Sequence, residues 1–144
     1  MNWTFRPATA SDWPDIAALL RAADLPLAGA ESHIDGFLLA FRDGALVGTA
    51  ALEHYGEVAL LRSVAVTAAE RGLGLGQELV RRILDRARAD GVTSVVLLTT
   101  TASGFFPRFG FRKTSRAEVP AAVKVSAEFR DACPVSSTVM MLHL

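Results

Sequence analysis

The feature that most constrains the fold is an apolar run followed by a glycine-rich turn and an amphipathic helix, all within residues 60–89. The run Leu-Leu-Arg-Ser-Val-Ala-Val at 60–66 predicts a strand. Arg-Gly-Leu-Gly-Leu-Gly follows at 71–76. The next segment has one apolar helical face, formed by Leu75, Leu79, Val80, Ile83, Leu84 and Ala87. A strand, a glycine loop and a helix N-terminus therefore follow one another directly.

Such a junction is typical of a phosphate-binding site. The first N–H groups of a helix have no internal partner, and glycines let a ligand approach the backbone closely. A P-loop requires a lysine after its last glycine, and none follows Gly76. A dinucleotide-binding loop requires Gly-x-Gly-x-x-Gly, and Leu79 occupies the position of its third glycine. The loop therefore indicates a phosphate ligand of another class.

Composition limits the remaining classes. A chain of 144 residues with 51% hydrophobic and 21% charged residues is typical of one compact domain. Its formal net charge of zero gives no reason to expect binding to nucleic acid or to an anionic membrane. No apolar run approaches the roughly 18 residues of a membrane span. The single cysteine excludes an internal disulfide and predicts a reducing compartment, hence a cytoplasmic protein.

Hydrophobic patterning predicts an α/β (α+β) fold. We expect strands at 3–6, 37–41, 45–52, 58–66, 94–99 and 137–142, another that opens at 110–111, and helices at 13–23, 75–89 and 103–109. The unbroken apolar run at 95–98 predicts a strand buried on both faces, as in parallel pairing. Joined through the helix at 75–89, the strands at 58–66 and 94–99 should form a right-handed βαβ unit.

Two motifs then identify a family resemblance. Arg71, Gly74 and Gly76 match Arg/Gln-x-x-Gly-x-Gly/Ala, and Phe-Phe-Pro-Arg-Phe-Gly-Phe occupies 105–111. Here the chain resembles the GNAT N-acetyltransferase superfamily. The resemblance implies a single domain over 1–144 with a mixed, mostly antiparallel sheet of six to seven strands. It also implies one parallel strand pair, about four helices and a homodimer.

The same resemblance implies acetyl-CoA as co-substrate and no metal. It places the coenzyme against one set of residues: Val64, Ala65, Val66, Arg71, Gly72, Leu73, Gly74, Leu75, Gly76, Thr100 and Phe106. Many members of the superfamily carry a tyrosine that protonates the departing thiolate, and Phe106 stands at that position here. A thiol of pKa about 8.5 can leave as thiolate at a cost of about 2 kcal/mol at neutral pH.

On the acceptor side, Glu53, His54 and Glu57 are candidate bases near one predicted turn. We expect Glu53 to act through water, the alternative being a solvated strand-end carboxylate. Arg62, which shares strand parity with Val64 and Val66, should point to the same side. It either anchors a substrate anion or pairs with Glu53 or Glu57.

His33, in an early loop, is a candidate substrate-pocket residue, the alternative being a loop side chain without such a role. Cys133 should be a buried small side chain rather than a nucleophile.

A closer resemblance concerns the acceptor. The run at 60–66, Leu-Thr-Thr-Thr-Ala-x-x-Phe-Phe at 98–106 and Cys-Pro-x-Ser-x-x-x-Met at 133–140 are similar to arsenic-resistance N-acetyltransferases. The sequence motif at 99–106 also resembles that of N-acetylglutamate synthases. The implied reaction is acetyl transfer in a ternary complex to the amine of a small, anionic, amino-acid-like or organoarsenical acceptor. The alternative is an acyl-CoA-binding sensor or partner module without turnover.

Overall fold

The computed structural model describes residues 2–134 and 136–144. Its centre is a seven-stranded sheet in the order β1-β2-β3-β4-β5-β7-β6, in which only β4 and β5 pair in parallel. The strands are β1 (Thr4–Pro7), β2 (Phe37–Arg42), β3 (Ala45–Tyr55), β4 (Val58–Val66), β5 (Ser94–Thr99), β6 (Arg112–Thr114) and β7 (Thr138–His143). This confirms the predicted mixed sheet with one parallel pair.

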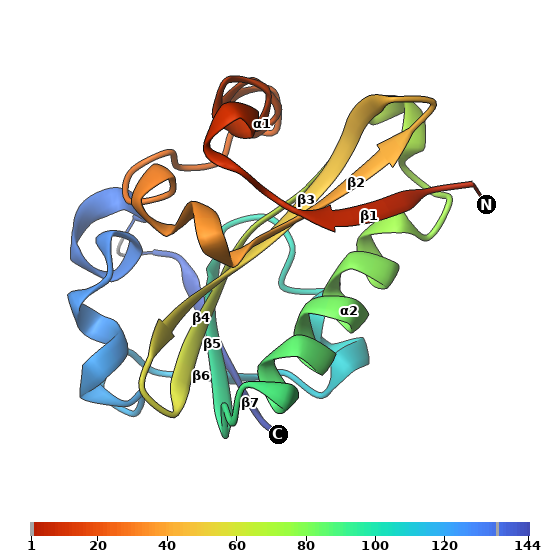
Figure 1. The fold of residues 1–144 in the computed structure, drawn as a ribbon. Coiled ribbons are helices and arrows are strands. Elements are labelled where there is room, and N and C mark those ends of the chain that lie inside the picture. Colours follow the sequence, from red (N-terminus) through yellow and green to blue (C-terminus); the bar gives the residue numbers. More distant parts are fainter. Residues whose placement is uncertain (1, 135) are drawn as a thin grey trace.

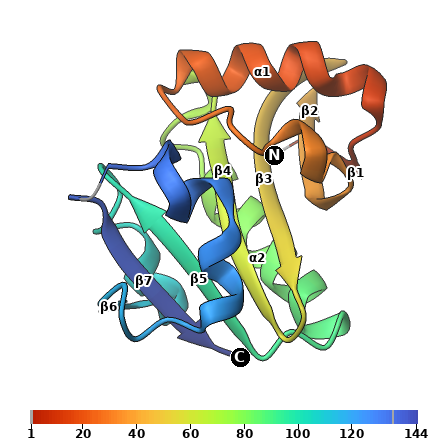
Figure 2. The same ribbon diagram turned by 90° about the vertical axis from the view of Figure 1, so that its left-hand side faces the viewer.

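Two α-helices lie on opposite faces of the sheet, α1 (Trp13–Ala22) and α2 (Leu75–Ala89) (Figures 1 and 2). Other helical segments are short turns. They are η1 (Ala10–Asp12), η2 (Glu31–Gly36), η3 (Ala68–Glu70), η4 (Phe106–Phe109), η5 (Ala121–Val125) and the π-helical η6 (Glu128–Ala132). The helix expected at 103–109 is therefore shorter than predicted. Within the described residues, no helix is both long and apolar enough to cross a membrane.

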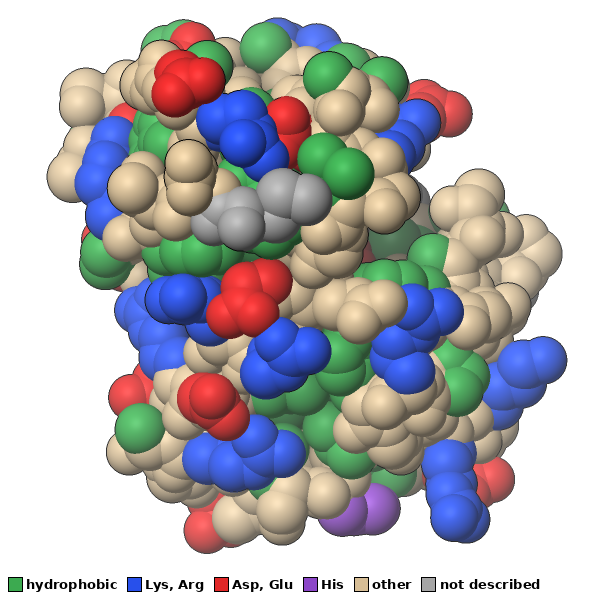
Figure 3. Space-filling model, turned by 90° about the vertical axis from the view of Figure 1, so that its right-hand side faces the viewer, with side chains coloured by type: hydrophobic (Ala, Val, Ile, Leu, Met, Phe, Trp, Pro, Cys, Tyr) green, Lys and Arg blue, Asp and Glu red, His purple; other side chains and the backbone are tan. Residues whose placement is uncertain are grey.

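Helix α2 covers one face with the apolar side predicted from its spacing. Its six predicted apolar residues are all buried, and they pack against β3 and β4 through residues such as Leu52 and Leu61. Its outer side carries ion pairs, including Glu78 with Arg81 and Arg82. Figure 3 views the molecule from the α2 side of Figure 1, and acidic and basic side chains are interspersed on this face.

The opposite face is covered by two separate segments. Ile16 and Leu20 of α1 pack on Phe37 and Leu39 of β2. Farther along the sheet, residues 119–129 pack on β4, β5 and β7, where Val123 joins a buried cluster that includes strand residues. The C-terminal segment, in which breakers at Pro120 and Pro134 make the pattern hard to read, thus forms the second cover of this face (Figure 2).

Candidate functional site

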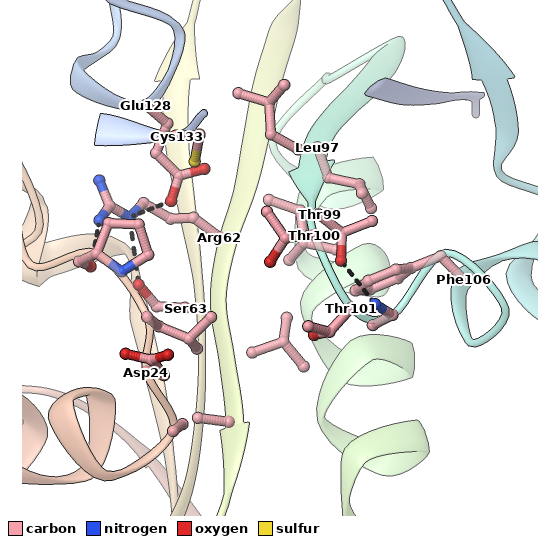
Figure 4. Close-up of a pocket in the computed structure, with 18 of the residues that line it drawn as sticks. Asp24, Arg62, Ser63, Leu97, Thr99, Thr100, Thr101, Phe106, Glu128 and Cys133 are labelled. Atoms are coloured by element: carbon pink, nitrogen blue, oxygen red, sulfur yellow. Dashed lines mark hydrogen bonds and ion pairs between the residues drawn. The ribbon is translucent and has the colours of Figure 1, made fainter. Parts of the chain in front are cut away.

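The parallel strands β4 and β5 separate after a short paired region. Their ladder runs only from Val58 to Leu60 on β4 and from Ser94 to Val96 on β5. Beyond these residues the facing edges diverge and border a cavity of about 610 Å³ (Figure 4). Backbone N–H and C=O groups on a separated edge need partners, so an extended ligand can pair with them. The cavity therefore combines open space with two strand edges that no longer pair with each other.

A β-bulge at Ser63 changes the direction of side chains along β4. Ala65 pairs with Thr49 and Arg62 pairs with Ala51, so β4 has one more residue than β3 in this interval. Ser63 adopts a φ of 57°, which is uncommon for a residue other than glycine. As a result, Val64 packs toward α2, whereas Arg62 lies on the other face. The parity prediction that put Arg62 on the same side as Val64 and Val66 is wrong, because the bulge reverses the alternation.

The glycine loop is shaped for close approach by a ligand. Gly72 and Gly74 have φ values of 81° and 87°, and the space where each would carry a Cβ is open. Helix α2 begins at Leu75, so its N-terminal N–H groups face this loop. A second cavity of about 300 Å³ lies here, and Arg71 and Arg108 line it together with the glycines. Partial positive charge at the helix N-terminus and two guanidinium groups suit a phosphate ligand.

Glu70 fastens this loop to the rest of the fold. Its carboxylate accepts hydrogen bonds from Trp3 Nε1 at 2.7 Å and from Arg42 Nε at 2.8 Å. The same hydrogen bonds lower the pKa of Glu70, that from Trp3 being the larger cause. The residue directly before Arg71 is thus tied to the N-terminal segment and to β2.

The structure places the expected coenzyme residues in two groups. Val64, Ala65, Thr100 and Phe106 line the larger cavity; Gly72, Gly74, Leu75 and Gly76 line the smaller; and Val66 and Arg71 line both. Leu73 is 40% exposed and lines neither of these two cavities.

The position of the usual thiolate acid is filled by a packed ring. Phe106 is buried and makes edge-to-face contacts with Phe105 and Phe111. Across the same wall, Thr99 Oγ1 accepts a hydrogen bond from the Ala102 N–H at 2.9 Å. The Phe106 ring therefore shapes the cavity wall but has no proton to donate. The hydroxyl groups on this wall belong to threonines.

Arg62 is the centre of a buried polar cluster. Its guanidinium donates to the carbonyl oxygens of Pro26 and Ala28 at 2.9 and 2.8 Å, and to Glu53 Oε2 at 2.9 Å. Nε donates to Ser63 Oγ at 3.2 Å and lies 3.4 Å from Glu128 Oε2. The arginine side chain is 0% exposed. Arg62 therefore pairs with Glu53, which is the alternative that the sequence left open. No face of the guanidinium is open to solvent.

Glu53 lies within β3, which continues three residues beyond its predicted end. The residue is 1% exposed, so it is not a solvated strand-end carboxylate. Tyr55 donates a hydrogen bond to Glu53, and His33 Nε2 lies 3.6 Å from Glu53 Oε1. Burial and this contact raise the pKa of Tyr55. Neither Glu53 nor His33 lines the larger cavity, whereas Arg62 separates Glu53 from it.

His54 and Glu57 also lie away from the cavity. His54 is exposed and pairs with Asp90 at 3.1 Å, and the Glu57 carbonyl oxygen accepts a hydrogen bond from the Thr93 N–H. Neither residue lines the cavity between β4 and β5. Of the three predicted bases, none therefore borders the space in which an acceptor could react.

The sequence-based prediction of the site missed several cavity residues, among them Glu128 and Cys133. Glu128 and Cys133 come from η6 and the residue after it, and both line the larger cavity across from Thr99 and Phe106 (Figure 4). Burial raises the pKa of Glu128 to about 7, against the opposing effect of Arg62. Burial, reinforced by Glu128, also raises the pKa of the Cys133 thiol to about 12, so it remains protonated and non-nucleophilic.

Comparisons with known proteins agree with this geometry. Residues 1–111 match the model of the acetyltransferase (GNAT) family. An amino-acid acetyltransferase of Neisseria meningitidis is 33% identical over 129 residues, covering 81% of this chain and 29% of that protein. Among solved structures, N-acetylglutamate synthase from Neisseria gonorrhoeae, complexed with coenzyme A and N-acetyl-glutamate, gives a TM-score of 0.85 at 27% identity. That alignment covers 100% of this chain and 35% of the synthase.

A relative of similar length is Rv2747 from Mycobacterium tuberculosis, solved in complex with CoA. Its TM-score is 0.82 at 28% identity, and the alignment covers 98% of this chain and 99% of that one. The chain thus spans about a third of the Neisseria proteins but nearly all of the mycobacterial one.

Proposed function

The chain belongs to the acetyltransferase (GNAT) family, and on that premise we propose that it transfers an acetyl group from acetyl-CoA to the amine of a small amino-acid-like acceptor. The observation that carries this proposal is the split between β4 and β5, which opens directly beside the glycine loop. A thioester reaching the split would expose its carbonyl carbon to an acceptor on the other side.

The residues around the loop fit the coenzyme. Gly72 and Gly74 leave room for a diphosphate, and Arg71 and Arg108 offer positive charge beside it. The backbone edge of β4 from 64 to 66 can pair with the extended pantetheine arm and polarise the thioester carbonyl. One donor aimed at developing negative charge commonly supplies about 3 kcal/mol.

The chemical nature of the acceptor is inferred from the comparisons with known proteins. Similarity to amino-acid acetyltransferases supports an amino-acid-like amine. An anionic acceptor was expected from Arg62, but that guanidinium is fully engaged with protein oxygens, so this argument no longer supports it. The proposal of an organoarsenical acceptor in a resistance role comes from the sequence resemblance alone. Arsinate-bearing amino acids are therefore included in the amine panel described below.

A second candidate function is favoured by Phe106. A phenyl ring cannot protonate a leaving thiolate, so the domain could bind acyl-CoA as a sensor or partner module without turnover. The cost of expelling an unprotonated thiolate is only about 2 kcal/mol, which positioning of the two substrates can offset. We therefore favour the transferase.

The test is thiol release from acetyl-CoA over a panel of amines. The panel contains the standard amino acids, their amides, and phosphonate- and arsinate-bearing amino acids. Release with one group of acceptors, and a mass increase of one acetyl group on that acceptor, is the expected result. Tight acetyl-CoA binding without release over the whole panel would favour the sensor, and no binding would contradict both functions.

Three further expectations stay predictions. We propose that residues 1–144 act as one domain, that the protein forms a homodimer and that it works in the cytoplasm. Sedimentation equilibrium would test the dimer, and fractionation of the source cells would test the location.

A further inference from the structure

The end of the cavity opposite the coenzyme loop contains few groups that can accept a proton. Among the described residues that line it, the candidates are Asp24, Glu128 and Cys133. Asp24 is exposed in the loop after α1, where water competes for any contact with an amine. The Cys133 thiol is held in its protonated form by burial and by the neighbouring carboxylate. Glu128 is left as the buried carboxyl group that borders the reacting space.

The surroundings of Glu128 fix its position. It is 4% exposed, and its Oε2 atom lies 3.4 Å from Arg62 Nε. Arg62 is itself held by Glu53 on β3 and by two carbonyl oxygens of the loop after α1. In Figure 4, Glu128 and Arg62 stand on one side of the cavity and Thr99 and Phe106 on the other. A molecule between them would meet the carboxylate on one side and the coenzyme-binding wall on the other.

The charged groups around Glu128 act in opposite directions. Desolvation disfavours its ionised form most strongly, Arg62 favours that form, and the charge of Glu53 disfavours it. The Cys133 thiol donates a hydrogen bond to the Glu128 carboxylate. The charge of Glu128 also acts on the Tyr55 hydroxyl of β3. The net result is a carboxyl group that changes charge near neutral pH, which suits a general base.

We propose that Glu128 binds the ammonium group of the acceptor and removes its proton, an inference that rests on the proposed acetyl transfer. The proton passes from nitrogen to a Glu128 carboxylate oxygen. The nitrogen lone pair then forms a bond to the thioester carbonyl carbon, and the carbon–sulfur bond breaks. The second amine proton goes to the departing thiolate, directly or through water, so the products are an amide and free CoA.

This assignment gives the other predicted residues supporting roles. Glu53, His33 and Tyr55 form a chain of contacts behind Arg62, outside the cavity. They position the guanidinium, and the guanidinium positions Glu128. Glu53 is thus a positioning residue, and the proton acceptor comes from the C-terminal segment.

The test compares Glu128→Gln with the wild type, using an acceptor found in the amine panel. The amide keeps the size of the side chain but cannot take a proton, so we expect kcat at pH 8 to fall about 10²- to 10⁴-fold. In the wild type, kcat should decline tenfold per pH unit below about pH 7. In the variant this inflection near pH 7 should be lost, and the rate should instead follow the neutral fraction of the acceptor amine. The deficit should shrink for acceptors whose amine is already neutral at the assay pH.

Controls separate catalysis from folding. Glu118→Gln changes an exposed glutamate of the same segment and should leave the rate and its pH profile unaltered. Acetyl-CoA affinity and thermal melting should show that Glu128→Gln remains folded. An active wild type and a Glu128→Gln variant with equal rates and equal pH profiles would overturn the base while leaving the transferase intact. A wild type without activity on any amine would remove the proposed function and the base together.

Discussion

The two ends of the cavity between β4 and β5 are built in different ways. The coenzyme end is nearly continuous in sequence, because β4, the glycine loop and the start of α2 follow one another from 64 to 76. The acceptor end combines residues from three distant segments: the loop at 23–26, the middle of β4 and the turn at 128–134. Local backbone geometry therefore forms the first end, whereas long-range polar contacts form the second. Mutations at the coenzyme end should therefore weaken coenzyme binding, whereas mutations at the acceptor end should lower stability or turnover.

The largest effect should follow from Gly74→Asp at the coenzyme end. An aspartate there must adopt a φ of 87° and places a negative charge beside the expected diphosphate. At an effective dielectric of 20, two charges 4 Å apart repel by about 4 kcal/mol, so calorimetry should show acetyl-CoA affinity reduced about 10³-fold.

Gly44→Asp is the matched control for that change. Gly44 has a φ of 80° in the β2–β3 hairpin and also has open space around it. The control carries the same backbone strain without a ligand nearby, so it should keep the affinity of the wild type. Equal affinity in Gly74→Asp and the wild type would refute the coenzyme assignment.

The next effect, at the acceptor end, is one of stability. In Arg62→Lys the charge remains, but one ammonium group cannot reach Glu53, Pro26 and Ala28 as the guanidinium does. Breaking part of a buried ion-pair cluster should cost about 3 kcal/mol and lower Tm by roughly 10 °C. Arg21→Lys, an exposed change on α1, should leave Tm within about 2 °C of the wild type.

The kinetics of Arg62→Lys distinguish the two roles considered for this residue. If Arg62 is the structural centre of the polar cluster, the variant should have a lower Tm. Its KM for the acceptor should change little at temperatures where the variant is folded. An unchanged Tm with acceptor KM raised ten- to a hundredfold would instead restore Arg62 as the anchor of a substrate anion.

A smaller effect depends on pH. The pKa of Glu128 is raised in the folded state to about 7 from an ordinary 4.5, so the native protein binds more protons between these values. Its stability should therefore fall as pH rises from about 4.5 to 7, by at most roughly 3 kcal/mol. Because Gln does not titrate, Tm of Glu128→Gln relative to the wild type should increase from pH 5 to pH 8. A constant difference would contradict the raised pKa.

The smallest effect is expected from Phe106→Tyr. A hydroxyl at the cavity wall restores the usual acid. Turnover should stay equal or rise by no more than about thirtyfold, which is the 2 kcal/mol leaving cost recovered in full. Phe109→Tyr on the same short helix, outside the larger cavity, serves as the control. A collapse in rate with coenzyme affinity preserved would mean that Phe106 contacts the reacting groups closely.

The same contrast explains what could be predicted from the sequence. The loop at 71–76 and helix α2 follow from glycine spacing and from apolar periodicity, both of which are local signals. Ser63 carries no local sign of a bulge, yet one extra residue there turned Arg62 to the other face of the sheet. Glu128 lies in a segment without clear periodicity, and only the folded chain brings it to Arg62. Pairing of Arg62 with Glu53 could be foreseen because a buried charge needs a partner.

The most direct test of the account is a crystal structure of the protein with CoA bound. The diphosphate should lie at the N-terminus of α2, beside Gly72 and Gly74, with the pantetheine arm along the β4 edge. The thiol should then lie in the cavity between β4 and β5, on the side that faces Glu128. A CoA molecule seated outside this split, or a thiol directed away from Glu128, would contradict it.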